Sequence, residues 1–501
     1  MKGEGLSERL LGWLAGSYRD NRTPLLSALI AGLAAHMFML TNKLPNHDDI
    51  ESIFGKGATV TSGRWGLELI KPLFPDCSMP WIYGLISILL LSVSACLMLR
   101  ILKIKSRPAQ ALTAALVLSF PSLTGTLCFM FTSSSYALAF LFSVLAVYEY
   151  QKPGLGRKAL AALFTVLCLS VYQAYISVTA SLFVLLMIAD ALDAEKSVRA
   201  TVLYGLGAMA MMLAALGVYF GVTLLVFRFT GAGFNDYVVG NVNGAVSIPT
   251  KTKMAYEAFR DIFVFRNFYV ISSELSRWLH IAFAALLLLF MALLSLKKKK
   301  PLHSLLLLGL LLLLPLSVCC MYLVMSPESI HTLVVYSFVC VYFLGALVID
   351  RLDGLRPGRD ILALLLAVFT LSNVYFANMC YLKLELQYES ARSFYTALLA
   401  QVRSTEGFDE NSRLAVIGRQ ENGLYIAPEL DTELLLGPAH DLVNIYSREN
   451  FLRLYLGADL PFASDEELAE IERDPAFAEM SEYPYYGSIK KIGDCIVVKL
   501  G

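Results

Sequence analysis

Two neighbouring carboxylates stand out because they follow directly on the first long apolar segment of the chain. They belong to the motif Asn46-His47-Asp48-Asp49. Two adjacent carboxylates suit general-base chemistry at a hydroxyl group, since one can accept the proton while the other orients the acceptor or holds a divalent cation. The same residues also suit the start of a helix near Ile50, because Asp is a favoured N-cap residue. Spacing alone leaves a catalytic role for Asp48 or Asp49 and a capping role equally open.

An arginine and a tryptophan are neighbours in the motif Ser62-Gly63-Arg64-Trp65, which begins fourteen residues after Asp48. The planar guanidinium of Arg64 is suited to a lipid phosphate, because its parallel N–H groups match phosphate oxygens. Alternatively, both residues are ordinary interfacial anchors, since Trp and Arg are common at headgroup depth.

A later polar segment adds Asp236 and four cations interleaved with Phe and Tyr, namely Lys251, Lys253, Arg260 and Arg266. One interpretation is a phosphate cradle. The other, slightly favoured, is a solvated amphipathic helix over 250–262.

Tyr172-Gln173-Ala174-Tyr175 interrupts another apolar stretch. Its two rings and its amide could stack on and hydrogen-bond a sugar, although Tyr is common at membrane boundaries in any case.

The elements that must position these residues are membrane-spanning helices. Of 501 residues, 57% are hydrophobic and 16% charged, against about 25% charged in soluble domains. Mean hydropathy is +0.61. Lys+Arg (41) equals Asp+Glu (41), which argues against a nucleic-acid partner because such proteins need a basic excess.

A helix needs about 20 mostly apolar residues to cross a bilayer. By this criterion the sequence predicts eleven spans: 24–44, 79–99, 109–127, 133–150, 159–174, 175–191, 201–227, 279–296, 302–325, 331–350 and 361–382.

Twenty Lys and Arg residues fall in alternate connections and in the segment before the first span, whereas the short connections 121–135, 172–175 and 326–330 contain none. The positive-inside rule then places the N-terminus in the cytoplasm, and eleven spans place the C-terminus outside.

The predicted organisation has three parts. Residues 1–23 form a cytoplasmic segment, 24–383 a membrane domain with large outer loops at 45–78 and 229–277, and 384–501 a small α/β domain outside the membrane. Within the last part, Arg413–Gly418 and Ser488–Leu500 have strand patterns, and 447–457 and 464–473 have helical ones.

The spans hold almost no ionisable residues, which weighs against an ion-coupled transporter, because such proteins carry charges near the bilayer midplane. The charges gather instead where the outer loops meet the membrane. This favours chemistry on a substrate whose head group lies at that surface. A lipid-linked sugar flippase or exporter and a non-catalytic envelope scaffold remain the alternatives.

The sequence resembles a family of membrane glucosyltransferases that modify bacterial O-antigen during serotype conversion. The resemblance rests on Asp48-Asp49, on Ser62–Trp65 and on Ser170–Tyr175. It also includes the end of the chain, from Tyr483-Pro484 through Gly487-Ser488-Ile489 to Val497-Val498-Lys499-Leu500.

The resemblance implies a GT-C type fold in the bacterial inner membrane, a polyprenyl-phosphate sugar as donor and a surface glycan as acceptor. It makes Asp48 or Asp49 the base. Arg64, Lys251, Lys253, Arg260 and Arg266 would hold the donor phosphate. The sugar or acceptor would contact His47, Trp65, Tyr172, Gln173, Tyr175 and Asp236. No cofactor is expected, because several GT-C branches dispense with a metal when the leaving group is a monophosphate. A divalent cation is not assumed.

Overall fold

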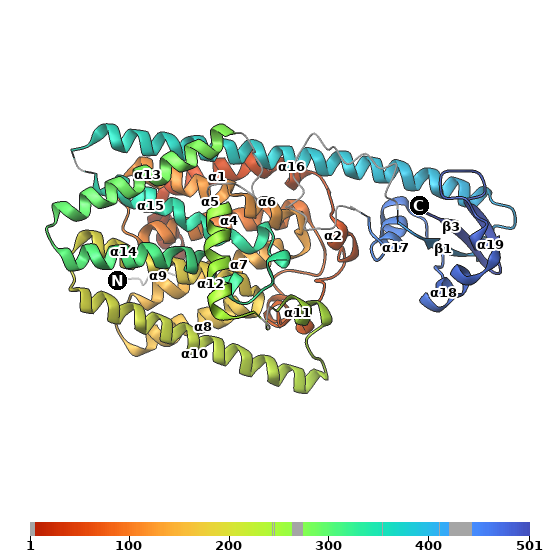
Figure 1. The fold of residues 1–501 in the computed structure, drawn as a ribbon, viewed down its shortest axis with the longest axis horizontal. Helices are drawn as coiled ribbons and strands as arrows, with labels where there is room; N and C mark the ends of the chain where they lie inside the picture. Colours follow the sequence, from red (N-terminus) through yellow and green to blue (C-terminus); the bar gives the residue numbers. More distant parts are fainter. Residues whose placement is uncertain are drawn as a thin grey trace.

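The protein is a long helical bundle that carries a small α/β unit at one end (Figure 1). The computed structural model describes residues 6–242, 244, 246–262, 274–352, 354–409, 411–419 and 443–501. The predicted phosphate-binding residue Arg266 lies outside these ranges.

The bundle is built from long apolar helices joined by short connections. They are α1 (Leu6–Thr41), α4 (Pro80–Ile101), α5 (Arg107–Ser119), α6 (Pro121–Cys128), α7 (Met130–Tyr150), α8 (Leu155–Val171), α9 (Ile176–Asp193), α10 (Val198–Thr230), α13 (Glu274–Lys297), α14 (Pro301–Val318), α15 (Val339–Arg351) and α16 (Arg356–Ser404).

Among the described residues, ten helical segments are long and apolar enough to cross a membrane. The sequence predicts eleven spans, and the predicted fifth span, 159–174, has no counterpart among these ten. It corresponds to α8, whose 17 residues lie at the lower limit of the length that a spanning helix needs. Because α8 packs between α7 and α10, it belongs to the bundle like its neighbours.

Proline marks many of the helix starts, since its fixed φ suits the first turn and its missing N–H costs nothing there. It occupies this position in α4, α5, α6, α14 and α16. Helix α1 is kinked at Asn21, which has a non-helical φ of −113° and lies three residues before Pro24. The predicted ninth span, 302–325, is shorter than expected, because α14 ends at Val318 and the 3₁₀ turn η4 (Cys320–Leu323) follows.

Burial divides the helices into a central and a peripheral set. The segment Thr332–Arg351, which comprises the 3₁₀ helix η6 (Thr332–Phe338) and α15, is buried from Thr332 to Ile349. Helices α10, α13 and α14 keep most of their apolar surface exposed. An apolar helix exposed along its length needs a lipid environment, so the peripheral helices agree with a polytopic membrane protein.

The connections gather at two opposite ends of the bundle. At the end that we call the basic end, Asp350 accepts hydrogen bonds from the backbone of Lys105 and Ser106. Arg351 pairs with Asp193 there, and Lys300 donates to the carbonyl oxygen of Ala194. The Lys- and Arg-rich connections of the sequence therefore meet on one side.

The other end, which we call the site end, collects the remaining connections. It contains α2 (His47–Glu51), η1 (Val60–Ser62), α3 (Gly66–Ile70), η2 (Gln173–Tyr175), α11 (Asp236–Asn241), η5 (Pro327–Ser329) and, against the bundle side, α12 (Ile248–Arg260). Hydrogen bonds join them: Asn235 N donates to Thr61 O at 3.0 Å, and Ser326 N donates to Asn241 O at 2.9 Å.

Helix α16 connects the bundle to the α/β unit, and Figure 1 shows it running past the site end. Its 49 residues make it about 73 Å long, roughly twice the length that a bilayer requires. The predicted boundary at 383/384 falls inside this continuous helix.

The α/β unit contains a three-stranded sheet in the order β1-β3-β2. Strand β1 (Arg413–Ile417) is parallel to β3 (Cys495–Lys499), which pairs antiparallel with β2 (Ile489–Ile492). Helices α17 (Arg448–Asn450), α18 (Asp465–Arg473) and α19 (Pro475–Ala478) and the π-helical turn η8 (Phe451–Tyr455) complete it. The predicted strand and helix patterns are confirmed. The site end of the bundle and this unit lie on the same side (Figure 1).

Candidate active site

Helix α2 presents the two neighbouring carboxylates at the site end. Its first turn is fixed by the buried Asn46, whose side-chain oxygen accepts a hydrogen bond from Asp49 N at 2.8 Å. Asp48 and Asp49 lie in this turn, where the helix dipole favours negative charge. Capping is therefore the role of Asn46, and both carboxylates are available for other contacts.

The Asp49 side chain points inward and is wholly buried. One carboxylate oxygen accepts hydrogen bonds from Ser78 Oγ and, at 3.1 Å, from Phe131 N, while the other pairs with the Lys43 ammonium. Lys43 also donates to Ser78 Oγ at 2.7 Å. Asp49 thus ties α2 to the ends of α1 and α7 and to the segment before α4. Its oxygens are occupied by protein donors.

The Asp48 side chain points outward, with 43% of its surface exposed. Its Oδ1 accepts a hydrogen bond from the Tyr446 hydroxyl and lies 3.8 Å from His47 Nε2. Burial, and then the hydrogen bond to the Asp48 carboxylate, raise the pKa of Tyr446, so its hydroxyl stays protonated and donates. Oδ2 accepts no hydrogen bond from any residue that the structure describes.

Arg64 lies on an aromatic floor formed by Tyr136 and Tyr172. These two rings stack with centroids 4.1 Å apart, and the guanidinium carbon is 5.4 Å from the centroid of Tyr172. Nη1 donates to the Tyr136 hydroxyl at 2.9 Å. Cation–π and hydrogen-bond contacts together orient the planar guanidinium, as binding of an anion would require.

The loop that carries Arg64 is anchored to α10 through Tyr219, whose hydroxyl donates to Gly63 O at 3.0 Å. Gln173 Nε2 donates to Ser62 O at 2.9 Å and to the Tyr219 hydroxyl at 3.0 Å. Trp65 is 9% exposed, stacks on Tyr219 and donates through Nε1 to Thr223 Oγ1 at 3.1 Å. Gln173 and Trp65 therefore hold the loop in place.

The remaining expected sugar-contacting residues have different environments. Tyr172 is buried under Arg64, and Tyr175 is buried against Phe140. Asp236 is exposed at the start of α11, beside Asn235, which tethers α11 to the loop that carries Arg64. Of this set, the nearly buried His47 directly precedes Asp48. Asp236 directly follows Asn235, which is bonded to the loop that carries Arg64.

The cations of α12 form a separate group. Lys253 lies 3.7 Å from Glu257, and Arg260 pairs with Asp261 at 2.7 Å, while Lys251 is half-buried. The helix packs on α14 and η4 and is tethered by the Tyr256 hydroxyl, which donates to Leu312 O at 2.6 Å. Arg64 packs instead on Tyr136 of α7 and on Tyr172, which precedes η2, so α12 and Arg64 have different neighbours.

His331 lies at the site end, directly before η6, and the sequence motifs did not single it out. Burial lowers the pKa of its imidazole, and the hydrogen bond from Nδ1 to Ser329 O, at 3.2 Å, raises it. Of the smaller effects, the charge of Arg64 lowers this pKa and the charge of Asp48 raises it. In the sequence, His331 is visible only as a histidine at the edge of a span.

Lys56 is a second residue that the motifs missed. Its side chain is buried, its Nζ donates to Phe131 O at 3.4 Å and it lies 5.4 Å from the centroid of the Tyr83 ring. Burial lowers the pKa of this amine. Because Phe131 N also donates to Asp49, Lys56 supports the same wall of the site.

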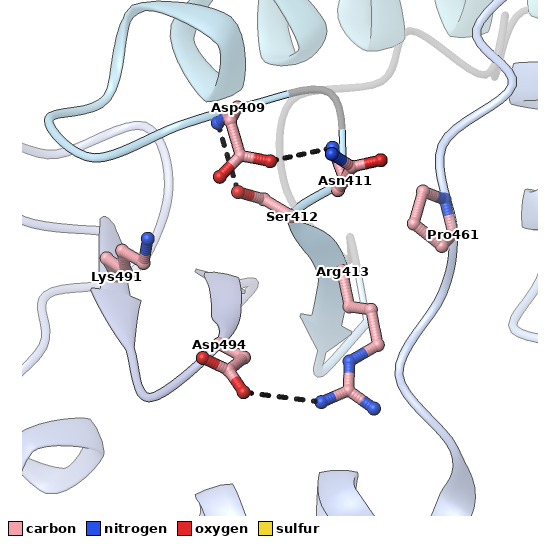
Figure 2. Close-up of a pocket in the computed structure, with 7 residues that line it drawn as sticks. All are labelled: Asp409, Asn411, Ser412, Arg413, Pro461, Lys491 and Asp494. Carbon is pink, nitrogen blue, oxygen red and sulfur yellow. Dashed lines mark hydrogen bonds and ion pairs between the residues drawn. The ribbon is translucent and has the colours of Figure 1, made fainter.

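A polar pocket of about 460 Å³ lies in the α/β unit, away from these residues (Figure 2). It is lined by Asp409, Asn411, Ser412, Arg413, Pro461, Lys491 and Asp494. Asn411 N donates to Asp409 Oδ1 at 2.7 Å, and Arg413 pairs with Glu467 and lies 3.9 Å from Asp494. These groups bond mainly to one another, and no aromatic ring is among the described residues that line the pocket.

The comparisons with known proteins bear on the bundle. A family model described as glucosyl transferase GtrII matches residues 37–342. This range contains Asp48, Asp49, Arg64 and His331 and ends before α16. No curated protein and no solved structure matches the chain.

Proposed function

The chain belongs to the glucosyl transferase GtrII family, and on that premise we propose that it transfers glucose from a polyprenyl-phosphate donor to a surface glycan such as O-antigen. The proposal places the site end at the outer face of the bacterial cytoplasmic membrane, in a GT-C type arrangement. The basic connections at the opposite end support this orientation, because Lys and Arg favour the cytoplasmic side.

One observation carries the proposal. The site end presents both an accessible carboxylate, Asp48, and an oriented guanidinium, Arg64. A sugar transfer from a phosphate needs both groups, one to accept a proton and one to stabilise the departing phosphate.

In the proposed reaction, an acceptor hydroxyl oxygen attacks C1 of the donor sugar. The bond between C1 and the phosphate oxygen breaks, and its electron pair leaves with the polyprenyl phosphate. The hydroxyl proton passes to the Asp48 carboxylate. Arg64 then binds the phosphate oxygens as their negative charge grows, which lowers the energy of the transition state more than that of the bound donor.

Asp48 is the better candidate for the base of the two neighbouring carboxylates. A general base must reach the hydroxyl within hydrogen-bond distance, and Asp48 is exposed. Asp49 is buried, with both oxygens engaged by Lys43, Ser78 and Phe131 N. We assign Asp49 the role of holding α2 in place. The α12 residues Lys251, Lys253 and Arg260 remain candidates for a further donor contact through the lipid phosphate.

The test is transfer of labelled glucose from a short-chain polyprenyl-phosphate glucose to a glycan extract by the reconstituted protein. Asp48→Asn should lower the transfer rate about 100-fold or more, because the general base is lost. The matched control is Asp465→Asn, since Asp465 is an exposed aspartate in the first turn of α18. This control should keep the wild-type rate.

Three outcomes would contradict the proposal. Full transfer by Asp48→Asn would exclude Asp48 as the base. Equal transfer from a nucleotide-activated glucose in lipid-free detergent would exclude the lipid-phosphate donor. Movement of the donor across the vesicle bilayer without any transfer would favour the flippase alternative.

A further inference from the structure

The α/β unit contacts helix α2 directly, although the two are separated by about 400 residues of chain. The Tyr446 hydroxyl donates to Asp48 Oδ1, and Asn450 Nδ2 donates to Glu51 Oε2 at 2.6 Å. The rings of His47 and Tyr446 also meet edge to face, with centroids 6.0 Å apart. Side chains before and within α17 are thus docked on the helix that presents the candidate base.

Packing fixes α17 and the turn before it in this position. Phe451 and Tyr455 stack with centroids 5.4 Å apart, and both contact Tyr388 of α16. The buried Arg448 donates to the carbonyl oxygens of Val416 and Gly418 at 3.0 and 3.2 Å, which joins α17 to β1. The segment that carries Tyr446 is therefore held by α16, by the sheet and by α2.

We infer that Tyr446 is a positioning residue for Asp48 and that the α/β unit completes the acceptor side of the active site. The hydrogen bond at Oδ1 fixes the carboxylate rotamer and leaves Oδ2 directed to an acceptor hydroxyl. This inference rests on the proposed function. It concerns a part of the chain beyond residue 342, where the family match ends.

The contacts of Asp48 indicate how loss of the Tyr446 hydroxyl would act. Without the hydrogen bond at Oδ1, the carboxylate is free to rotate away from the acceptor hydroxyl, whereas the contacts that orient Arg64 stay as they are. The substitution should therefore lower kcat and leave the donor KM unchanged.

The experiment measures kcat, the donor KM and the thermal unfolding midpoint of the full-length protein with Tyr446→Phe. We expect kcat to fall about ten-fold, because a hydrogen bond to a charged group is lost. The donor KM should stay unchanged. A loss of folded protein would also lower kcat, but it would lower the unfolding midpoint as well, and we expect the midpoint to keep its wild-type value.

Two controls accompany Tyr446→Phe. Tyr486→Phe alters a fully exposed tyrosine of the same unit and should leave kcat unchanged. Asn450→Ala removes the second docking hydrogen bond but keeps the hydrogen bond to Asp48, so it should leave kcat close to the wild-type value.

The outcomes separate this inference from the proposed function. A wild-type kcat in Tyr446→Phe, or an equal fall of kcat in Asn450→Ala, would overturn the role of Tyr446. Absence of transfer by the wild type, or full transfer by Asp48→Asn, would instead contradict the proposed function itself.

Discussion

Asp48 and Asp49 are neighbours in the chain, yet their carboxylates have opposite environments. Successive side chains of a helix point about 100° apart, so a helix lying on the bundle turns one of two neighbours inward and the other outward. Asn46 starts this helix by capping its first turn. Asp49 then meets Lys43 and Ser78, while Asp48 meets solvent and Tyr446.

At the residue scale, we predict that Asp49→Asn destabilises the protein. The substitution leaves Lys43 without its carboxylate partner in a largely buried contact, which should lower the free energy of unfolding by about 2–3 kcal/mol. The measurement is the thermal unfolding midpoint in detergent, with Asp465→Asn as the control. A variant with wild-type stability and no transfer would instead identify Asp49 as the base.

At the scale of single elements, the loop that carries Arg64 depends on its contact with α10. Gly63 ends η1 with a φ of +71°, a region that favours glycine, and its carbonyl oxygen accepts the hydrogen bond from Tyr219. A methyl group at Gly63 would lie 2.5 Å from the Tyr219 hydroxyl oxygen. The glycine therefore allows the loop to approach α10 closely.

We predict that Gly63→Ala displaces this loop and weakens donor binding. Gly231→Ala is a matched control, because Gly231 has a φ of +69° and open space around it. Both variants carry the strain of a positive φ, about 1–2 kcal/mol, but only Gly63→Ala adds the clash. The donor KM should rise in Gly63→Ala alone, and adding Tyr219→Phe should partly restore it. Equal KM values in the two glycine variants would contradict this account.

At the scale of the whole molecule, the two ends of the bundle differ in charge and in role. The basic end gathers the Lys- and Arg-rich connections, and the site end gathers Asp48, Arg64, His331 and the α/β unit. The lipid-exposed helices α10, α13 and α14 lie between the two ends. A substrate with a lipid tail could thus lie in the bilayer while its head group reaches the site end.

We predict that the α/β unit lies outside the cytoplasm. Alkaline phosphatase fused after Gly501 should be active, because this enzyme folds only outside, whereas green fluorescent protein at the same place should stay dark. The reverse pattern is expected for fusions after Gly154, in the connection between α7 and α8. Fluorescence from the fusion after Gly501 would overturn the orientation, and with it the assignment of the site end to the outer face.

The sequence by itself determined the features that depend on local composition and period. Long apolar runs predicted the helices, alternate basic connections predicted two distinct ends, and short strand-like runs predicted strands at Arg413–Gly418 and Ser488–Leu500. These signals are reliable because each arises from neighbouring residues in one element. The acidic motif was recognisable for the same reason.

Only the tertiary structure decided which residues surround that motif. The contacts of Asp48 with Tyr446 and of Arg64 with Tyr136 join positions far apart in the chain, and no periodicity encodes such pairs. Trp65 and Gln173 have the composition of sugar-binding residues but brace the loop that carries Arg64, because α10 packs beside it. The rotation of α2 separated the two carboxylates, and this rotation follows from packing against Lys43 and Phe131 rather than from local sequence.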